Sequence, residues 1–288
     1  MKNLHRYFCS TAAALLLFTG TALADSARHA LSDKTILDQR AMLAKSTDGA
    51  GFGPQSPRDI NSIVGNNGRM FEAAPAHTAM NLCNIHFHES AEHKGGEFTK
   101  YAGNGDGHGY GTGYAYSGKL TAAELAPLDM VIGKNDHGDL APGDTIEVHY
   151  VYSSAQVKPG PTLGSCLSKA IMNPQLRVET QVYVLVNDAD ALNFIVLTKI
   201  AEVNGLNQAP NIPSDTGVPV QYTGSTTGPG YNEKASPLQV SWSVRPKVAK
   251  VNIRTVGDWL KSNVFDETHA HGVRNLVINP DLLSAIAK

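Results

Sequence analysis

The sequence predicts a mainly β (α+β) protein, a single domain built on a large twisted, mostly antiparallel sheet with short peripheral helices. Short runs of β-branched and aromatic residues recur between turn-forming residues from about position 80 onward. With 288 residues, of which 42% are hydrophobic and 17% charged, the chain can bury a full core. The runs predict strands over residues 82–89, 145–153, 177–187, 193–200, 239–244 and 248–254.

The first 24 residues have the pattern of a secretory signal peptide. Lys2 and Arg6 form a basic start, residues 11–19 are apolar but too few to span a bilayer, and residues 22–24 (ALA) form a small-x-small cleavage site. We therefore expect a protein that is exported to the periplasm or secreted after cleavage near Ala24. No membrane association is expected of the mature form.

An N-terminal arm is expected over residues 25–60, followed by one folded domain over 61–288. The arm is polar, with a helical stretch near residues 30–45 and a Gly- and Pro-rich segment at 49–57. Weak helical periodicity returns at 256–264 and 281–287. These segments predict the peripheral helices.

A glycine-rich stretch, GNGDGHGYGTG, occupies residues 103–113. It lacks the spacing and the Lys-Ser/Thr ending of a phosphate-binding loop, so an irregular surface loop of open function is predicted.

The charge balance favours a small-molecule partner. The chain carries 24 basic and 26 acidic side chains, a formal charge of −2, without a marked Lys/Arg run. Nucleic acid and anionic membrane surfaces are therefore not expected as partners. The sequence does not indicate an oligomeric state.

Two cysteines, Cys83 and Cys166, remain after signal cleavage. An even pair in an oxidising compartment predicts a disulfide bond. The alternative is that Cys83, three residues before His86, is a metal thiolate; an exported site with a second Cys available usually oxidises instead.

Three histidines lie on predicted strands. Because alternate strand residues share a face, His86 and His88 project the same way from one strand, and His149 comes from another. If the strands are neighbours, the three imidazoles can converge on one cation with a fourth position open. The alternative is a set of hydrogen-bonded core histidines. A second His-x-His, at 269–271, lies in a polar segment and is interpreted as a solvated turn.

Four segments follow in the order of the landmark motifs of α-type carbonic anhydrases, which this sequence resembles. They are HFHESAEH (86–93), EVHYV (147–151), YTGSTTGP (222–229) and VSW (240–242). The short spacing from His88 to Glu92, and Cys83 ahead of the first histidine, are more similar to the related δ-type. The resemblance implies an α-carbonic-anhydrase-like catalytic domain that interconverts carbon dioxide and bicarbonate.

The resemblance also implies a Zn²⁺ cofactor held by His86, His88 and His149. Glu147 then corresponds to a residue that orients a ligand imidazole. Glu92 corresponds to a buried carboxylate that accepts a hydrogen bond from a threonine beside the zinc-bound hydroxide.

Either Thr227 or Thr226 takes the role of that threonine, depending on whether the alignment contains a one-residue gap. Val151, Val240 and Trp242 correspond to the apolar wall where carbon dioxide rests. Four histidines, His77, His93, His108 and His137, are candidates for the proton shuttle, and none sits at a convincing family position.

Two other functions stay open at this point. A cupin metalloenzyme would use Glu92 as a fourth ligand to iron or manganese, but the usual glycine before the first histidine is replaced by Met80. A non-catalytic periplasmic zinc-binding protein would need only the three histidines.

Overall fold

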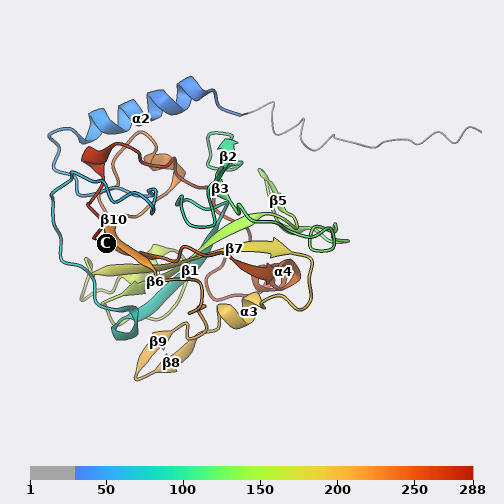
Figure 1. Cartoon of the computed structure of the whole chain (residues 1–288). Coiled ribbons are helices and arrows are strands. Elements are labelled where there is room, and N and C mark those ends of the chain that lie inside the picture. Colours follow the sequence, from blue (N-terminus) through green and yellow to red (C-terminus); the bar gives the residue numbers. More distant parts are fainter. Residues whose placement is uncertain (1–29, 288) are drawn as a thin grey trace, which may run out of the picture.

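A central sheet of six strands organises the protein (Figure 1). The structure is a computed structural model, and it describes residues 30–287; the predicted signal peptide lies outside the described residues. Five strands follow the order β1-β6-β7-β11-β10, and β12 pairs with another part of β7. The strands are β1 (Asn81–Glu89), β6 (Thr145–Ser153), β7 (Leu176–Val186), β10 (Val220–Ser225), β11 (Gln239–Val244) and β12 (Ala249–Asn252).

The sheet is mixed, and most of its strand pairs are antiparallel. The pairs β1–β6, β6–β7 and β10–β11 are antiparallel, whereas β11 and β12 both run parallel to β7. A parallel neighbour needs a long crossover connection rather than a tight turn. The chain between β7 and β11 is long enough to let β11 run beside β7 in the same direction. The mainly β class and the mostly antiparallel sheet are confirmed, and the two parallel pairs with β7 are the part that the sequence did not predict.

Side-chain alternation places the two faces of β1 and β6 in different surroundings. Ile85, Phe87, Val148 and Tyr150 point into the larger hydrophobic core. The alternate residues of both strands, which include the three histidines, point to the opposite face. All nine residues of β6 are buried, so both faces are covered.

Two helices at the periphery agree with the sequence pattern. Helix α2 (Asp33–Thr47) starts where the Ser32 side chain accepts a hydrogen bond from Thr35 N at 3.1 Å, and it lies along the outside of the molecule (Figure 1). Helix α4 (Ile253–Lys261) follows β12 directly. The helix expected at 281–287 is instead one 3₁₀ turn, η4 (Pro280–Leu282).

The strand predicted over 193–200 is wrong: this segment contains the short helix α3 (Phe194–Leu197). Asn193 caps it by accepting from the backbone N–H groups of Ile195 and Val196. Phe194 and Leu197 are buried while the two residues between them are half exposed, which is the helical period of burial.

Three small hairpins and three further 3₁₀ turns complete the elements; the glycine-rich stretch is largely the irregular loop between β2 and β3, as predicted. None of the helices within 30–287 is long and apolar enough to cross a membrane. These elements are β2 (Lys100–Asn104), β3 (Thr112–Ala115), β4 (Ile132–Asn135), β5 (Gly138–Leu140), β8 (Ala201–Val203), β9 (Leu206–Gln208), η1 (His77–Ala79), η2 (Leu163–Cys166) and η3 (Pro229–Tyr231).

The end of the predicted arm packs on the sheet. Gln55, Ser56 and Arg58 are fully buried, and Ser56 Oγ accepts from Ser225 N at 3.1 Å. Because the arm packs on the domain here, the predicted boundary between the arm and the catalytic domain near residue 60 stays a prediction.

Candidate metal centre

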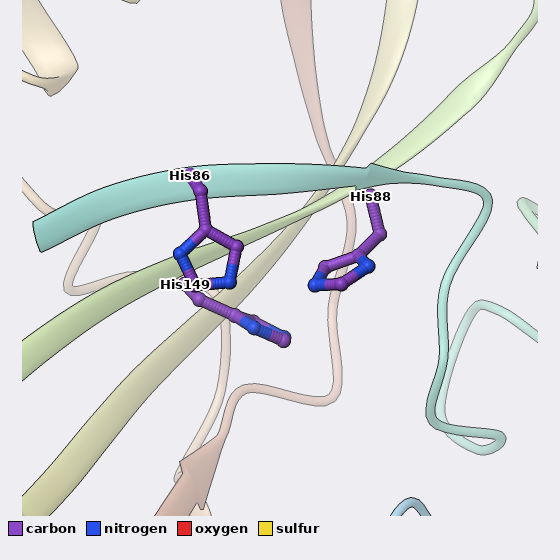
Figure 2. Close-up of side chains that lie close together, drawn as sticks. All are labelled: His86, His88 and His149. Carbon is purple, nitrogen blue, oxygen red and sulfur yellow. The ribbon is translucent and has the colours of Figure 1, made fainter. Parts of the chain in front are cut away.

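Three imidazoles meet on the face of the sheet opposite the larger core. His86 and His149 are directly paired across β1 and β6, and His88 lies two residues further along β1. Figure 2 shows the two β1 rings turned toward the ring from β6. One nitrogen from each ring lies within 4.8 Å of the other two. The three side chains converge as expected, because β1 and β6 are neighbouring strands in the structure.

The second nitrogen of each ring has its own hydrogen-bond partner. His86 Nδ1 lies 2.6 Å from Asn84 Oδ1, and His149 Nε2 lies 2.8 Å from Glu147 Oε1. His88 Nδ1 lies 2.9 Å from the carbonyl oxygen of Gly272. Such partners fix the ring orientation and leave the other nitrogen free for a metal.

The histidine environment favours neutral rings. Burial lowers the pKa of His86 well below its ordinary value, and the neighbouring imidazoles lower it further. Burial likewise lowers the pKa of His88 to about 4. His88 Nε2 is buried without a hydrogen-bond partner among the described residues. A buried acceptor nitrogen of this kind, beside two others, fits a zinc ion, which prefers neutral imidazole ligands.

Glu92 is buried beside the triad and is hydrogen-bonded to Thr227. The Thr227 hydroxyl donates to Glu92 Oε2 at 2.6 Å, and Arg274 N donates to Oε1 at 3.3 Å. Thr226 lies next to this pair, but its hydroxyl is shared with Ser236 at 3.0 Å. Of the two threonines left open by the alignment, Thr227 is the one in contact with the carboxylate.

Glu147 links His149 to a buried chain of polar groups. Its Oε1 accepts from His93 Nδ1 at 2.7 Å, and the opposite ring nitrogen of His93 lies 2.7 Å from Tyr222 Oη. Burial alone would raise the pKa of Glu147, but His93 and His149 together hold this pKa well below its ordinary range. The carboxylate therefore stays ionised and holds both rings.

A small apolar cavity of about 50 Å³ opens beside the three imidazoles. Its wall contains the predicted Val151, Val240 and Trp242. It is several times larger than the roughly 10–15 Å³ that one water molecule requires. The remaining lining residues are Leu163, Leu176, Val178, Thr226 and Thr227.

The other histidines fall into different surroundings. His93 is fully buried with both ring nitrogens bonded, and His77 lies 3.4 Å from Glu179. His108 and His137 lie together on the glycine-rich loop and the β4–β5 hairpin. His271, interpreted as part of a solvated turn, has its half-exposed ring 5.5 Å from that of His86.

The predicted disulfide is confirmed, because Cys83 and Cys166 are bonded. The alternative of a Cys83 thiolate ligand is therefore wrong. The bond joins β1 to η2, which carries Leu163 into the cavity wall.

Sequence reasoning missed two of the hydrogen-bond partners of the triad. Asn84 precedes His86 by two residues on the same strand, so strand alternation could have identified it. Gly272 contributes a backbone carbonyl from a distant segment without regular structure, and a sequence pattern carries no signal for it.

Three imidazoles with one free nitrogen each, beside a threonine–carboxylate pair, form a group that could hold a metal ion in an enzyme site. The sequence model of the delta carbonic anhydrases matches residues 77–255, which contain the whole triad. The chain belongs to the delta carbonic anhydrase family and is a carbonic anhydrase enzyme. No curated protein matches it significantly.

Two solved carbonic anhydrase structures are similar to this chain at low identity. One is an alpha-carbonic anhydrase from Photobacterium profundum, 15% identical, with 85% of this chain and 95% of that chain covered and a TM-score of 0.27. Another is carbonic anhydrase Cah3 from Chlamydomonas reinhardtii, in complex with acetazolamide, 16% identical over 80% and 88% of the two chains, with a TM-score of 0.27. The family assignment rests on the sequence match alone.

Proposed function

We propose that this protein catalyses the zinc-dependent reversible hydration of carbon dioxide to bicarbonate and a proton. The proposal rests on one observation: three imidazoles, each with one nitrogen free, converge beside the Thr227–Glu92 pair and line an apolar cavity. His86, His88 and His149 would hold the zinc ion.

Zinc on three imidazoles supplies a hydroxide nucleophile near neutral pH, because it lowers the pKa of water to about 7, a magnitude known from carbonic anhydrase itself. The protein residues then orient the reactants. His88 Nδ1 and His149 Nε2 are held by Gly272 and Glu147, so the free nitrogens keep a fixed direction.

Thr227 restricts the direction of hydrogen bonding in the site. Its only hydroxyl proton is donated to Glu92, so its oxygen can only accept a hydrogen bond from a hydroxyl group in the cavity. Thr227 therefore orients the lone pairs of that group toward the substrate. Arg274 N holds the second oxygen of Glu92, and this keeps the carboxylate in place.

The apolar wall suits carbon dioxide, which has no charge and no hydrogen-bond donor. Val151, Val240 and Trp242 line the cavity beside the imidazoles. Such a substrate can be positioned by the shape of the cavity but not by charged groups. The same apolar wall offers no charged partner to the bicarbonate product.

The position of Glu92 disfavours the cupin alternative. Its oxygens lie 3.7 Å from His88 Nδ1 and 3.9 Å from His149 Nε2, the two nitrogens that already have protein partners. Both oxygens also accept other hydrogen bonds. Glu92 is thus placed behind the rings and not as a fourth ligand on their open side.

Export is part of the proposal. The signal-peptide pattern predicts it, and the Cys83–Cys166 disulfide supports an oxidising compartment. Amino-terminal sequencing of the protein recovered from the periplasm or the medium tests cleavage after Ala24. An intact Met1 on the active protein would contradict it.

Metal analysis combined with stopped-flow hydration tests the function. His149→Ala is expected to abolish bound zinc and hydration together, whereas Glu92→Ala should keep most of the zinc and lose most of the rate. Retained hydration in His149→Ala would refute the ligand set. Zinc loss in Glu92→Ala would favour a cupin-type site, and zinc-loaded wild type without hydration would favour a non-catalytic zinc-binding protein.

A further inference from the structure

The glycine-rich loop at 103–113 packs against the segment that orients a metal ligand. That segment, residues 270–274, runs beside β1: His271 N donates to Phe87 O at 2.9 Å, and Glu89 N donates to His271 O at 2.8 Å. On β1, His88 lies between these two bonds, and its Nδ1 is 2.9 Å from the carbonyl oxygen of Gly272, the next residue after His271.

The same segment also holds the carboxylate of Glu92. Two residues after Gly272, the backbone N–H of Arg274 donates to Glu92 Oε1. A shift of the 270–274 backbone would therefore disturb two groups at once. One is the His88 ring, a proposed zinc ligand, and the other is the Glu92 carboxylate, which accepts from Thr227.

The loop also holds this segment by two hydrogen bonds. Val273 N donates to Gly109 O at 2.8 Å, and the Tyr110 hydroxyl donates to Ala270 O at 3.0 Å. Tyr110 is itself fixed, because its ring stacks on that of His137 with centroids 4.1 Å apart. The loop and β1 thus both hydrogen-bond to the 270–274 backbone.

Gly109 makes this close approach possible. It is buried with φ of +94°, and a Cβ atom there would lie 2.6 Å from both the N and the O of Val273. No side chain fits at that distance without moving the Val273 backbone, and Gly272 is the residue directly before it.

Two other glycines of the loop provide matched controls. Gly107 has φ of +90°, but a Cβ atom there would meet only the Leu31 side chain at 3.7 Å, an ordinary contact. Gly111 has φ of +66°, and a Cβ atom there would meet only Gly105 Cα at 3.8 Å. Both are exposed. They share the backbone strain of Gly109 without its clash.

We propose that Gly109 is a positioning residue of the metal centre, which allows the glycine-rich loop to fix the Gly272 carbonyl against His88. The inference rests on the proposed function, since it assumes that His88 binds zinc. It assigns a purpose to a motif that the proposed mechanism does not otherwise use.

The test compares Gly109→Ala with Gly107→Ala, using zinc as the probe. The zinc dissociation constant is measured by competition with a chelator, and thermal unfolding is measured without metal. Gly109→Ala is expected to weaken zinc binding by about 10- to 100-fold, the usual effect of losing an outer partner of a ligand. Gly107→Ala should bind zinc as the wild type does, and it should lose less metal-free stability than Gly109→Ala because it adds no backbone clash.

Cobalt(II) in place of zinc adds a readout that a general loss of stability would not change. The visible spectrum of the cobalt protein reports ligand geometry, so it should shift in Gly109→Ala and not in Gly107→Ala. Equal zinc affinity and identical spectra in the two variants would overturn the inference.

If Gly109→Ala does not fold, Tyr110→Phe decides the question. It removes the hydrogen bond to Ala270 O and keeps the stacked ring. A several-fold weaker zinc affinity supports the loop's role, and an unchanged affinity overturns it. Hydration by the wild-type protein reports separately on the proposed function, so the two failures are distinguishable.

Discussion

Thr227 donates its hydroxyl proton to Glu92 at 2.6 Å, although the two residues are 135 positions apart in the chain. Its neighbour Thr226 shares a hydrogen bond with Ser236 instead. Both threonines line the cavity, so composition alone does not distinguish them. Their hydroxyl partners do.

Thr227→Ala is expected to lower kcat/KM by about a hundredfold or more, the usual cost of losing one group that orients a reacting oxygen. Zinc content should stay unchanged, because Thr227 does not contact the triad through its hydroxyl. Thr226→Ala is the matched control and should keep most of the activity. Stopped-flow hydration of both variants checks this, and a larger loss in Thr226→Ala would reverse the assignment.

Val151→Phe should fill the cavity without disturbing the metal. Val151 shares its strand with His149 and lines the cavity of about 50 Å³. We expect kcat/KM to fall at least tenfold while zinc content is retained, with a stability cost of about 1–3 kcal/mol from overpacking. Val151→Ala, which enlarges the cavity, is the control and should stay active. Full activity in Val151→Phe would place the substrate elsewhere.

Loss of the disulfide should destabilise the protein strongly. Cys83 and Cys166 are separated by 83 residues, and a loop of that size contributes about 4 to 5 kcal/mol in the chain-entropy model. Denaturant unfolding of Cys83→Ala/Cys166→Ala against the wild type measures the difference. Reductant should lower the midpoint of the wild type and leave the double variant unchanged; equal midpoints with and without reductant in the wild type would contradict the expectation.

Glu124 should contribute to acid stability. Hydrogen bonds from Lys250 Nζ and Thr121 N lower the pKa of its carboxyl from 4.5 to about 2. A lowered folded-state pKa favours folding above pH 4.5, and that contribution is lost as the pH falls from about 4.5 to about 2. Urea midpoints over this range should fall less steeply in Glu124→Gln than in the wild type. Glu202→Gln, an exposed change on β8, should keep the wild-type slope.

The parts of the site that follow from side-chain alternation could be predicted from the sequence. His86, His88 and His149 stand in apolar strand patterns, the first two at alternating positions, and the structure has strands there. The segment 193–200 has the same composition, but Asn193 caps a helical turn that a list of β-branched residues does not reveal. Local patterns compete at such positions, and tertiary packing decides between them.

Groups supplied by the backbone could not be predicted. The Gly272 carbonyl holds His88, and the Arg274 N–H holds Glu92, but any residue type has these atoms. The choice between Thr226 and Thr227 likewise depends on how the chain leaves β10, since both side chains have the same chemistry. These features depend on the final path of the chain.

The pairing of β11 with β7 has a kinetic consequence. Trp242 reaches the cavity only after β11 has crossed over to lie parallel to β7, and His149 lies on β6, the next strand beyond β7. Contacts between segments this distant in sequence have high contact order, so the metal-free chain should fold over milliseconds to seconds rather than microseconds. The three proposed ligands come from β1 and β6, so zinc would need only that pairing to bind, and it would stabilise the native state by mass action.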